Sequence, residues 1–275
     1  SGLDYGRMRT WGSLTFIAAG LVGGWVLGTF GAERIIFLLL ASALVLVIVA
    51  HLIAAQSDHP RVQHAAHADV TWRDTWHLLT RQRFMLLFLA SGLGQASHAV
   101  YYAFATIHWQ SIGIAPLAIG MLWAVGVGAE IGVFVVSKKL IARFGAPMLL
   151  IVGIGAGVLR WPLTALEPPL AVLFVVQLLH GLTFGAVHLA AVHLIATLAG
   201  EARSATAQGV HNTLAAGFFM AGAIGGAGWL FAAYGGQAFL AMALLSALAL
   251  VAAVVFAKRH AAHEADGDRS SSAEV

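Results

Sequence analysis

The chain has 275 residues, of which 60% are hydrophobic and 10% are charged, and its formal net charge is +3. Soluble domains carry about 25% charged residues, so this composition excludes an ordinary soluble core and predicts lipid as the solvent. The absence of cysteine excludes disulfides, thiolate metal sites and cysteine nucleophiles. Lys and Arg are spread over polar links instead of forming one patch, which argues against nucleic acid as a partner.

Apolar stretches of about 20 residues recur along the chain, which is the length needed to cross a hydrocarbon core of about 30 Å. They lack the alternating pattern of membrane β-strands, so we predict an all-α polytopic membrane protein. Hydropathy windows place about eight transmembrane helices, near residues 10–30, 35–55, 84–107, 115–136, 147–165, 169–195, 208–230 and 237–257.

The polar, histidine-rich link 56–83 divides the chain into two blocks. We predict two helices in residues 1–55, a cytoplasmic central loop at 56–83, a six-helix bundle at 84–257 and a disordered cytoplasmic tail at 258–275. The chain opens with SGLDYG, without an initiator methionine or a signal-peptide pattern, and we interpret it as a fragment.

Basic residues mark one side of the predicted bundle. The link SKKLIARFG carries Lys138, Lys139 and Arg143, whereas the links SIGIAP, LEPP and YGGQ carry no Lys or Arg. Because basic links stay cytoplasmic, both ends of the chain are predicted in the cytoplasm, with the protein in a bacterial inner membrane.

Four ionisable side chains fall near the middle of predicted spans: Glu130, Arg160, His180 and His98. An ionisable group there costs at least about 2.5 kcal/mol, so each one indicates a functional site. All four are about 11 to 14 residues into their helices, so a rise of about 1.5 Å per residue puts them at similar depth.

Further polar residues share a helical face with this layer. Ser91, Gln95, His98 and Tyr102 recur at helical spacing, and so do Gln177, His180 and His188. We expect these faces to line a cavity, with His211 and Asn212 adding polar groups nearer the cytoplasm.

Other interpretations of these residues remain open. In one interpretation, Glu130 and Arg160 form an ion pair that only stabilises the fold. In another, the histidines are buried residues whose hydrogen bonds are made within the protein. The linker motif HPRVQHAAH is a weak candidate for a metal site. An intramembrane enzyme built on His180, His188 and His193 is disfavoured, because His193 points far from His180 on a helix and no HExxH motif accompanies them.

Four segments in order resemble the seventh to tenth helices of the lactose permease-like branch of the major facilitator superfamily, most closely its phenylpropionate transporter group. They are QASHAVYYAFATIHWQSIG, MLWAVGVGAEIGVFVVSKKLIARFG, GVLRWPLTA and VVQLLHGLTFGAVHLAA, and DYGRMRTWGS resembles the entry to its fifth helix. The resemblance implies eight helices of a twelve-helix fold, with alternating access around a midplane site.

The same resemblance implies roles for individual residues. Glu130, Arg160 and His180 match the acid, arginine and histidine of the proton-coupling and substrate network, and Arg9 matches a substrate-binding arginine. Arg9 is equally well interpreted as a basic loop residue that follows the positive-inside rule. Two departures stand out: Phe16 replaces the sugar-stacking tryptophan, and Thr183 replaces a carboxylate that exchanges the proton.

We therefore expect proton-driven transport of a small organic solute, first an aromatic carboxylate. Arg160 is expected to hold the carboxylate, Tyr101 or Tyr102 to contact the ring, and Gln95 and His98 to line the site. A sugar or nucleoside symporter and a non-transporting receptor or scaffold are the alternatives. No enzymatic activity, cofactor or metal is expected, and the complete protein is expected to be monomeric.

Overall fold

The computed structural model describes residues 31–56 and 72–273, together with scattered positions between 11 and 30. The chain separates into two compact units, Met8–Asp69 and Val70–Val275 with Ser1–Arg7. In the first unit, a short 3₁₀ turn, Ala32–Arg34, leads into the apolar helix α2, Ile35–Gln56. Arg9, Phe16 and the linker histidines His59, His64 and His67 lie outside the described residues.

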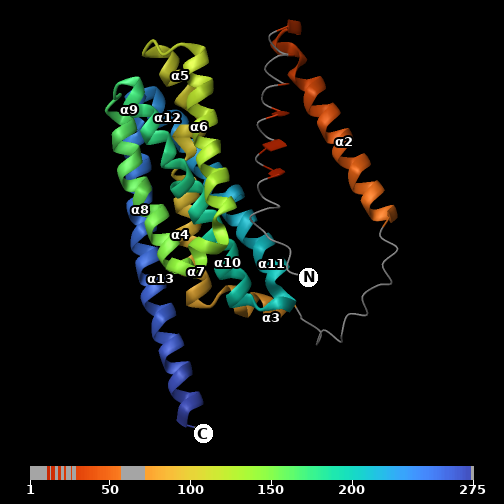
Figure 1. Ribbon diagram of the computed structural model, residues 1–275, viewed down its shortest axis with the longest axis vertical. Helices are drawn as coiled ribbons and strands as arrows, with labels where there is room; N and C mark the ends of the chain where they lie inside the picture. The colour runs from red at the N-terminus through yellow and green to blue at the C-terminus, as the bar shows by residue number, and fades with distance from the viewer. Residues whose placement is uncertain are drawn as a thin grey trace. The chain divides into compact units, whose positions relative to one another are not determined.

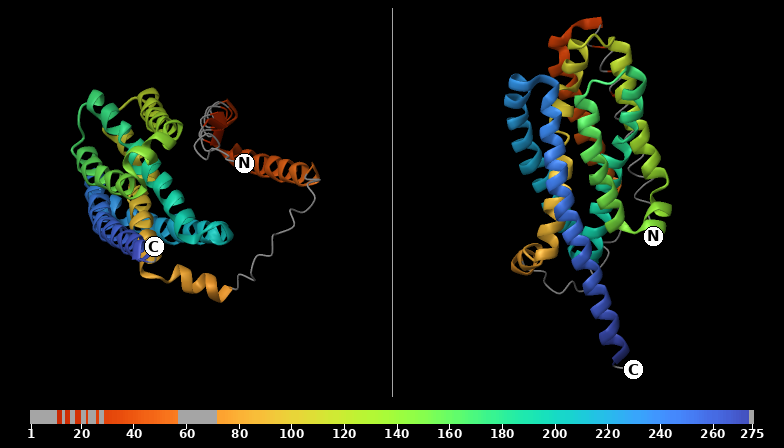
Figure 2. Two further views of the ribbon diagram at one scale, coloured as in Figure 1. Left: turned by 60° about the horizontal axis from the view of Figure 1, so that its bottom comes forward. Right: turned by 90° about the vertical axis from the view of Figure 1, so that its left-hand side faces the viewer.

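The second unit is an antiparallel bundle of helices, shown in Figure 1 and, from two further directions, in Figure 2. Its described helices are α3 (Trp72–Leu79), α4 (Gln82–Ala96), α5 (Ala99–Ser111), α6 (Pro116–Val135), α7 (Ser137–Phe144), α8 (Ala146–Ala165), α9 (Leu170–Leu178), α10 (Val187–Ala199), α11 (Glu201–Asn212), α12 (Met220–Tyr234) and α13 (Phe239–Ala273). Two π-helical segments join them, η2 (Gly181–Ala186) between α9 and α10, and η3 (Thr213–Phe219) between α11 and α12.

The described helices confirm a polytopic, all-α membrane protein. Five helical stretches are long and apolar enough to cross a bilayer: Gln82–Ser111, Pro116–Val135, Ala146–Ala165, Leu170–Ala199 and Glu201–His263. The last one turns at the 3₁₀ segment η4, Gly235–Ala238, and α12 and α13 lie on either side of this turn. Apolar side chains such as Leu159 and Val175 point outward and are more than 60% exposed, as lipid-facing groups are.

Glycine and proline set the ends of these helices. Gly145, Gly200 and Gly235 adopt positive φ values of 74°, 73° and 54°, which favour glycine, and they lie between α7 and α8, before α11 and after α12. Pro116 occupies the first turn of α6, where its missing N–H costs no hydrogen bond.

Two segments differ from the sequence prediction. Residues 258–273, expected as a disordered tail, continue α13 without a break, and the first part of this extension, AKRHAAHEA, consists largely of good helix formers. The linker 56–83 contains α3, whose sequence WRDTWHLL places apolar residues at helical spacing. The other domain boundaries expected from the sequence stay predictions.

Two apolar clusters fill the bundle at different depths. One contains Phe84, Leu150, Leu194 and Phe256, and the other contains Tyr101, Trp109, Trp161 and Phe239. Helices α6, α8 and α13 contribute to both clusters from different halves of their length, whereas α4 and α10 contribute to the first cluster and α5, α9 and α12 to the second. The boundary between them is a single layer across the bundle.

Candidate functional site

The four ionisable side chains predicted from the sequence lie in this boundary layer. His98 separates the two clusters along α4 and α5, and Glu130, Arg160 and His180 do the same along α6, α8 and the α9–η2 junction. All four are buried, and Arg160 has no exposed surface. The structure therefore brings together, at one depth, groups that are far apart in the sequence.

Arg160 is the centre of the layer. Its Nη1 donates to Thr183 Oγ1 at 2.9 Å and to His180 Nδ1 at 3.1 Å, and its Nη2 donates to Gln177 Oε1 at 3.0 Å. Its guanidinium also lies 4.6 Å from the ring centres of both Tyr101 and Trp161. These rings hold the cation by cation–π contact.

Among the described residues, no carboxylate is hydrogen-bonded to Arg160. Within the described part of the chain its hydrogen bonds go to a hydroxyl, an amide and an imidazole. Its Nε and the Nε2 of Gln177 are buried donors without an acceptor. Burying a cation with neutral partners and leaving donors unmet is costly, so this layer is electrostatically suited to an anion.

The hydrogen bonds assign the protonation of both imidazoles. His98 Nδ1 faces the carbonyl of Gln95 at 3.1 Å, so Nδ1 carries the proton and Nε2 accepts from Thr183 Oγ1 at 3.1 Å. His180 Nδ1 accepts from Arg160, so the proton of a neutral His180 is on Nε2. Both imidazoles are therefore neutral in this arrangement.

Glu130 reaches the network through His180. Its Oε2 lies 3.8 Å from His180 Nε2, the nitrogen that carries the proton. Arg160 thus connects to Glu130 through the imidazole, and not by the direct ion pair that one interpretation of the sequence proposed. The guanidinium, the imidazole and the carboxylate therefore lie in a row, with His180 between the two charged groups.

An aromatic wall borders the polar layer. Tyr102 is 39% exposed, and its ring is stacked 5.5 Å from that of His98 and 6.4 Å from that of Trp123. Tyr101 lies 4.5 Å from Trp123 and donates its hydroxyl proton to Gln177 Oε1 at 3.1 Å. Aromatic faces next to a buried guanidinium suit a ligand with both a ring and a negative charge.

Close helix packing positions Glu130 against His180. A side chain at Gly181 would place its Cβ 2.7 Å from the carbonyl oxygen of Ala129, and one at Gly185 would meet Val133 at 3.4 Å. The two glycines belong to η2, which packs against α6. Single π-helical turns inside α-helices occur frequently at functional sites, and this one starts directly after His180.

Not every predicted site residue joins this network. Tyr101, His98, Glu130, Arg160 and His180 do, and Tyr102 borders it. Gln95 contributes its backbone carbonyl, and Arg9 lies outside the described residues. Ser91, expected on the same face as His98, instead hydrogen-bonds His211 Nε2 at 2.8 Å, because the helix is interrupted by a turn at Ser97 and His98.

Three partners of Arg160 were absent from the predicted site: Thr183, Gln177 and Trp161. Gln177 was on the predicted polar face of His180, and Thr183 was noted only as a departure from a family pattern. The aromatic neighbour Trp123 was also missed, although it precedes Glu130 by seven residues, which is about two helical turns on one face.

The fold and the site define a multi-pass helical membrane protein with a buried, charged layer at mid-bundle. The family model described as "MFS_1 like family" matches residues 1–242. The chain therefore belongs to this family, in the major facilitator superfamily.

Two curated relatives are similar to this chain. The "Probable 3-phenylpropionic acid transporter" of Escherichia coli (strain K12) is 34% identical over 244 residues, which are 89% of this chain and 63% of that protein. The "Maltose permease" of Geobacillus stearothermophilus is 26% identical over 216 residues, 78% of this chain and 53% of that protein. The chain thus spans a little over half the length of these relatives. No solved structure matches it.

Proposed function

We propose that this chain belongs to a secondary transporter of a small aromatic carboxylate, driven by protons. The observation that carries the proposal is the buried Arg160, whose hydrogen-bond partners in the described part of the chain are neutral and whose Nε lacks an acceptor there. A carboxylate oxygen supplies the missing acceptor, and Tyr102 and Trp123 offer ring faces beside it. The relative named for 3-phenylpropionic acid supports transport of an anionic aromatic solute and not an enzymatic reaction.

The carboxylate requirement is tested with two ligands that share a ring and a chain length. Binding of 3-phenylpropionate and of the neutral alcohol 3-phenylpropanol to the purified chain is compared by calorimetry. A charge-assisted hydrogen bond contributes about 1.5–3 kcal/mol, so the acid should bind about 10- to 150-fold more tightly. Arg160→Gln should abolish this preference.

The control for Arg160→Gln is Arg143→Gln, which removes an exposed basic residue from α7 and should leave the preference intact. Equal binding of the acid and the alcohol to the unmodified chain contradicts the anion site. The relative named as a maltose permease motivates one further ligand, maltose. Binding of maltose without binding of the acid supports a neutral sugar as the solute.

Proton coupling is proposed to involve Glu130 and His180. The arrangement that supports it is the 3.8 Å approach of Glu130 Oε2 to the protonated nitrogen of His180. In proteoliposomes that contain the complete protein, Glu130→Gln should remove accumulation driven by a pH gradient and leave solute exchange at equal pH near the unmodified rate. If accumulation in this variant persists, Glu130 does not carry the proton.

A further inference from the structure

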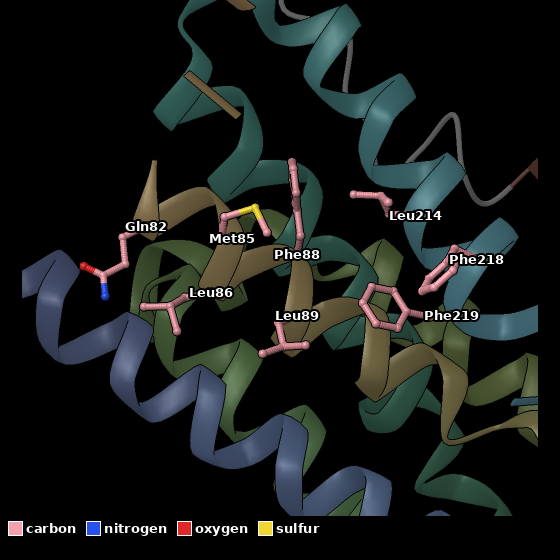
Figure 3. Close-up of a pocket in the computed structure, with 8 residues that line it drawn as sticks. All are labelled: Gln82, Met85, Leu86, Phe88, Leu89, Leu214, Phe218 and Phe219. Atoms are coloured by element: carbon pink, nitrogen blue, oxygen red, sulfur yellow. The ribbon is translucent and has the colours of Figure 1, made fainter. Parts of the chain in front are cut away.

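A cavity lies away from the charged layer, at the end of the bundle where α4 begins. Its volume is about 300 Å³, and it is lined by α4 and η3, with Gln82, Met85, Phe88, Leu89, Leu214 and Phe219 among the lining residues. Figure 3 shows Gln82 at one end of the lining and Phe218 and Phe219 at the other. Apart from Gln82, the lining is apolar.

The groove begins at the end of a candidate membrane span and extends along that span. Gln82 is the first residue of the span Gln82–Ser111, and Leu89 is seven residues further, about 10 Å deeper. At the deep end the ring of Phe219 lies against Gly92, where a Cβ would meet it at 2.5 Å. The polar end is therefore at the depth of lipid headgroups, and the apolar lining is at the depth of acyl chains.

The polar end of the groove is basic. Arg259 on α13 donates from Nη1 to Gln82 Oε1, which holds its guanidinium at the mouth. Arg81 precedes Gln82 and is exposed, and Lys258 precedes Arg259 and is also exposed. The first turn of α4 has no side-chain cap, so its free N–H groups add positive potential at the same end.

We propose that this groove binds an anionic phospholipid. One acyl chain lies along the apolar lining between α4 and η3, and the phosphate is bound by Arg259. The occupant follows from the combination of two features: an apolar groove on the outer surface of this helical unit, where Phe218 is 74% exposed, and a basic group at the end of the candidate membrane span. Each basic residue near an anionic headgroup contributes about 1 kcal/mol. The site does not depend on the proposed transport function.

The experiment is native mass spectrometry of the purified 275-residue chain in detergent, titrated with phosphatidylglycerol or with phosphatidylcholine of the same acyl chains. The unmodified chain should retain phosphatidylglycerol preferentially. Arg259→Gln should weaken that binding about fivefold, which corresponds to about 1 kcal/mol. Leu89→Trp, at a position 40% exposed and therefore tolerant of size, should fill the groove and remove lipid binding.

The matched control is Lys139→Gln, which removes an exposed basic residue from α7 and should leave lipid binding unchanged. A thermal melt of each variant separates lost binding from lost folding. Equal retention of the two lipids overturns the proposal, as does a loss with Lys139→Gln equal to that with Arg259→Gln. A dimer that disappears with Leu89→Trp assigns the groove to a second copy of the chain and likewise overturns it.

Discussion

Thr183 links two parts of the buried layer through one hydroxyl. Its Oγ1 accepts from Arg160 Nη1 and donates to His98 Nε2, so the hydroxyl fixes both the guanidinium and the imidazole. The side chain is buried, and water is not available to replace either bond. A residue noted in the sequence only because it is not a carboxylate therefore has a defined role in ordering the site.

Replacing this hydroxyl by a methyl group should destabilise the protein. Thr183→Val keeps the shape and leaves two buried polar groups each short of a partner, which costs about 1–3 kcal/mol. The free energy of unfolding is measured by SDS-induced unfolding in mixed micelles. Thr213→Val is the control, because the exposed Thr213 hydroxyl bonds only the local carbonyl of Gly209. A loss for Thr183→Val no larger than that of the control contradicts the bridging role.

At the scale of elements, the contact between α6 and η2 determines how close Glu130 comes to His180. Gly181 lets the two backbones approach until a Cβ would be 2.7 Å from the carbonyl oxygen of Ala129. Small residues at helix contacts allow this approach in membranes, where hydrophobic association does not drive helices together. The two side chains themselves do not enforce the distance, since Glu130 Oε2 and His180 Nε2 are 3.8 Å apart, too far for a hydrogen bond.

Gly181→Ala should push α6 away from η2. Overpacking of this kind costs about 1–3 kcal/mol, and the displaced helix carries Glu130 away from His180. We expect a lower melting temperature and a lower rate of transport driven by a pH gradient in the complete protein. Gly128→Ala on α6 is the matched control, because nothing lies within 4 Å of its added Cβ. Equal behaviour of the two variants is the result that contradicts the close-packing argument.

At the scale of the whole molecule, the ends of the second unit differ in charge and in contacts. At one end, His108 of α5 lies 3.5 Å from Glu167 in the link between α8 and α9, and Gln237 donates to the carbonyl of Ala165 at 3.0 Å. At the other end, α7 carries Lys138, Lys139 and Arg143. The positive-inside rule predicts that α7 is cytoplasmic and that Glu167 is on the opposite side of the membrane.

The chain has no cysteine, so single cysteines report this orientation directly. With a maleimide that does not cross membranes, Glu167→Cys should be labelled in intact spheroplasts and Lys139→Cys should not. Both positions should be labelled after permeabilisation, which shows that each cysteine is accessible. Labelling of Lys139→Cys alone in intact spheroplasts contradicts the predicted topology.

Much of the architecture was predictable from the sequence. The helices from α4 to α13 lie close to the predicted spans, because a bilayer demands long apolar stretches whose hydropathy is visible without any tertiary contact. The common depth of His98, Glu130, Arg160 and His180 was also predicted, since depth follows from position along a helix of constant rise. The helical continuation of α13 through Ala273 was not, because its polar end DGDRSSSA contains Asp, Gly and Ser, which are poor helix formers.

Only the tertiary structure decided which of these groups touch. Side-chain partners depend on how each helix is rotated and how closely it is packed, and glycines such as Gly181 set both in ways that hydropathy does not record. The structure therefore showed that Arg160 binds Gln177, Thr183 and His180, that His180 stands between Arg160 and Glu130, and that Ser91 belongs with His211. By itself, the sequence determined that lipid surrounds the protein, where the helices lie along the chain and at what depth the ionisable side chains are, because these follow from local composition. The charge balance around Arg160, and with it the case for an anionic ligand, follows from contacts between distant helices.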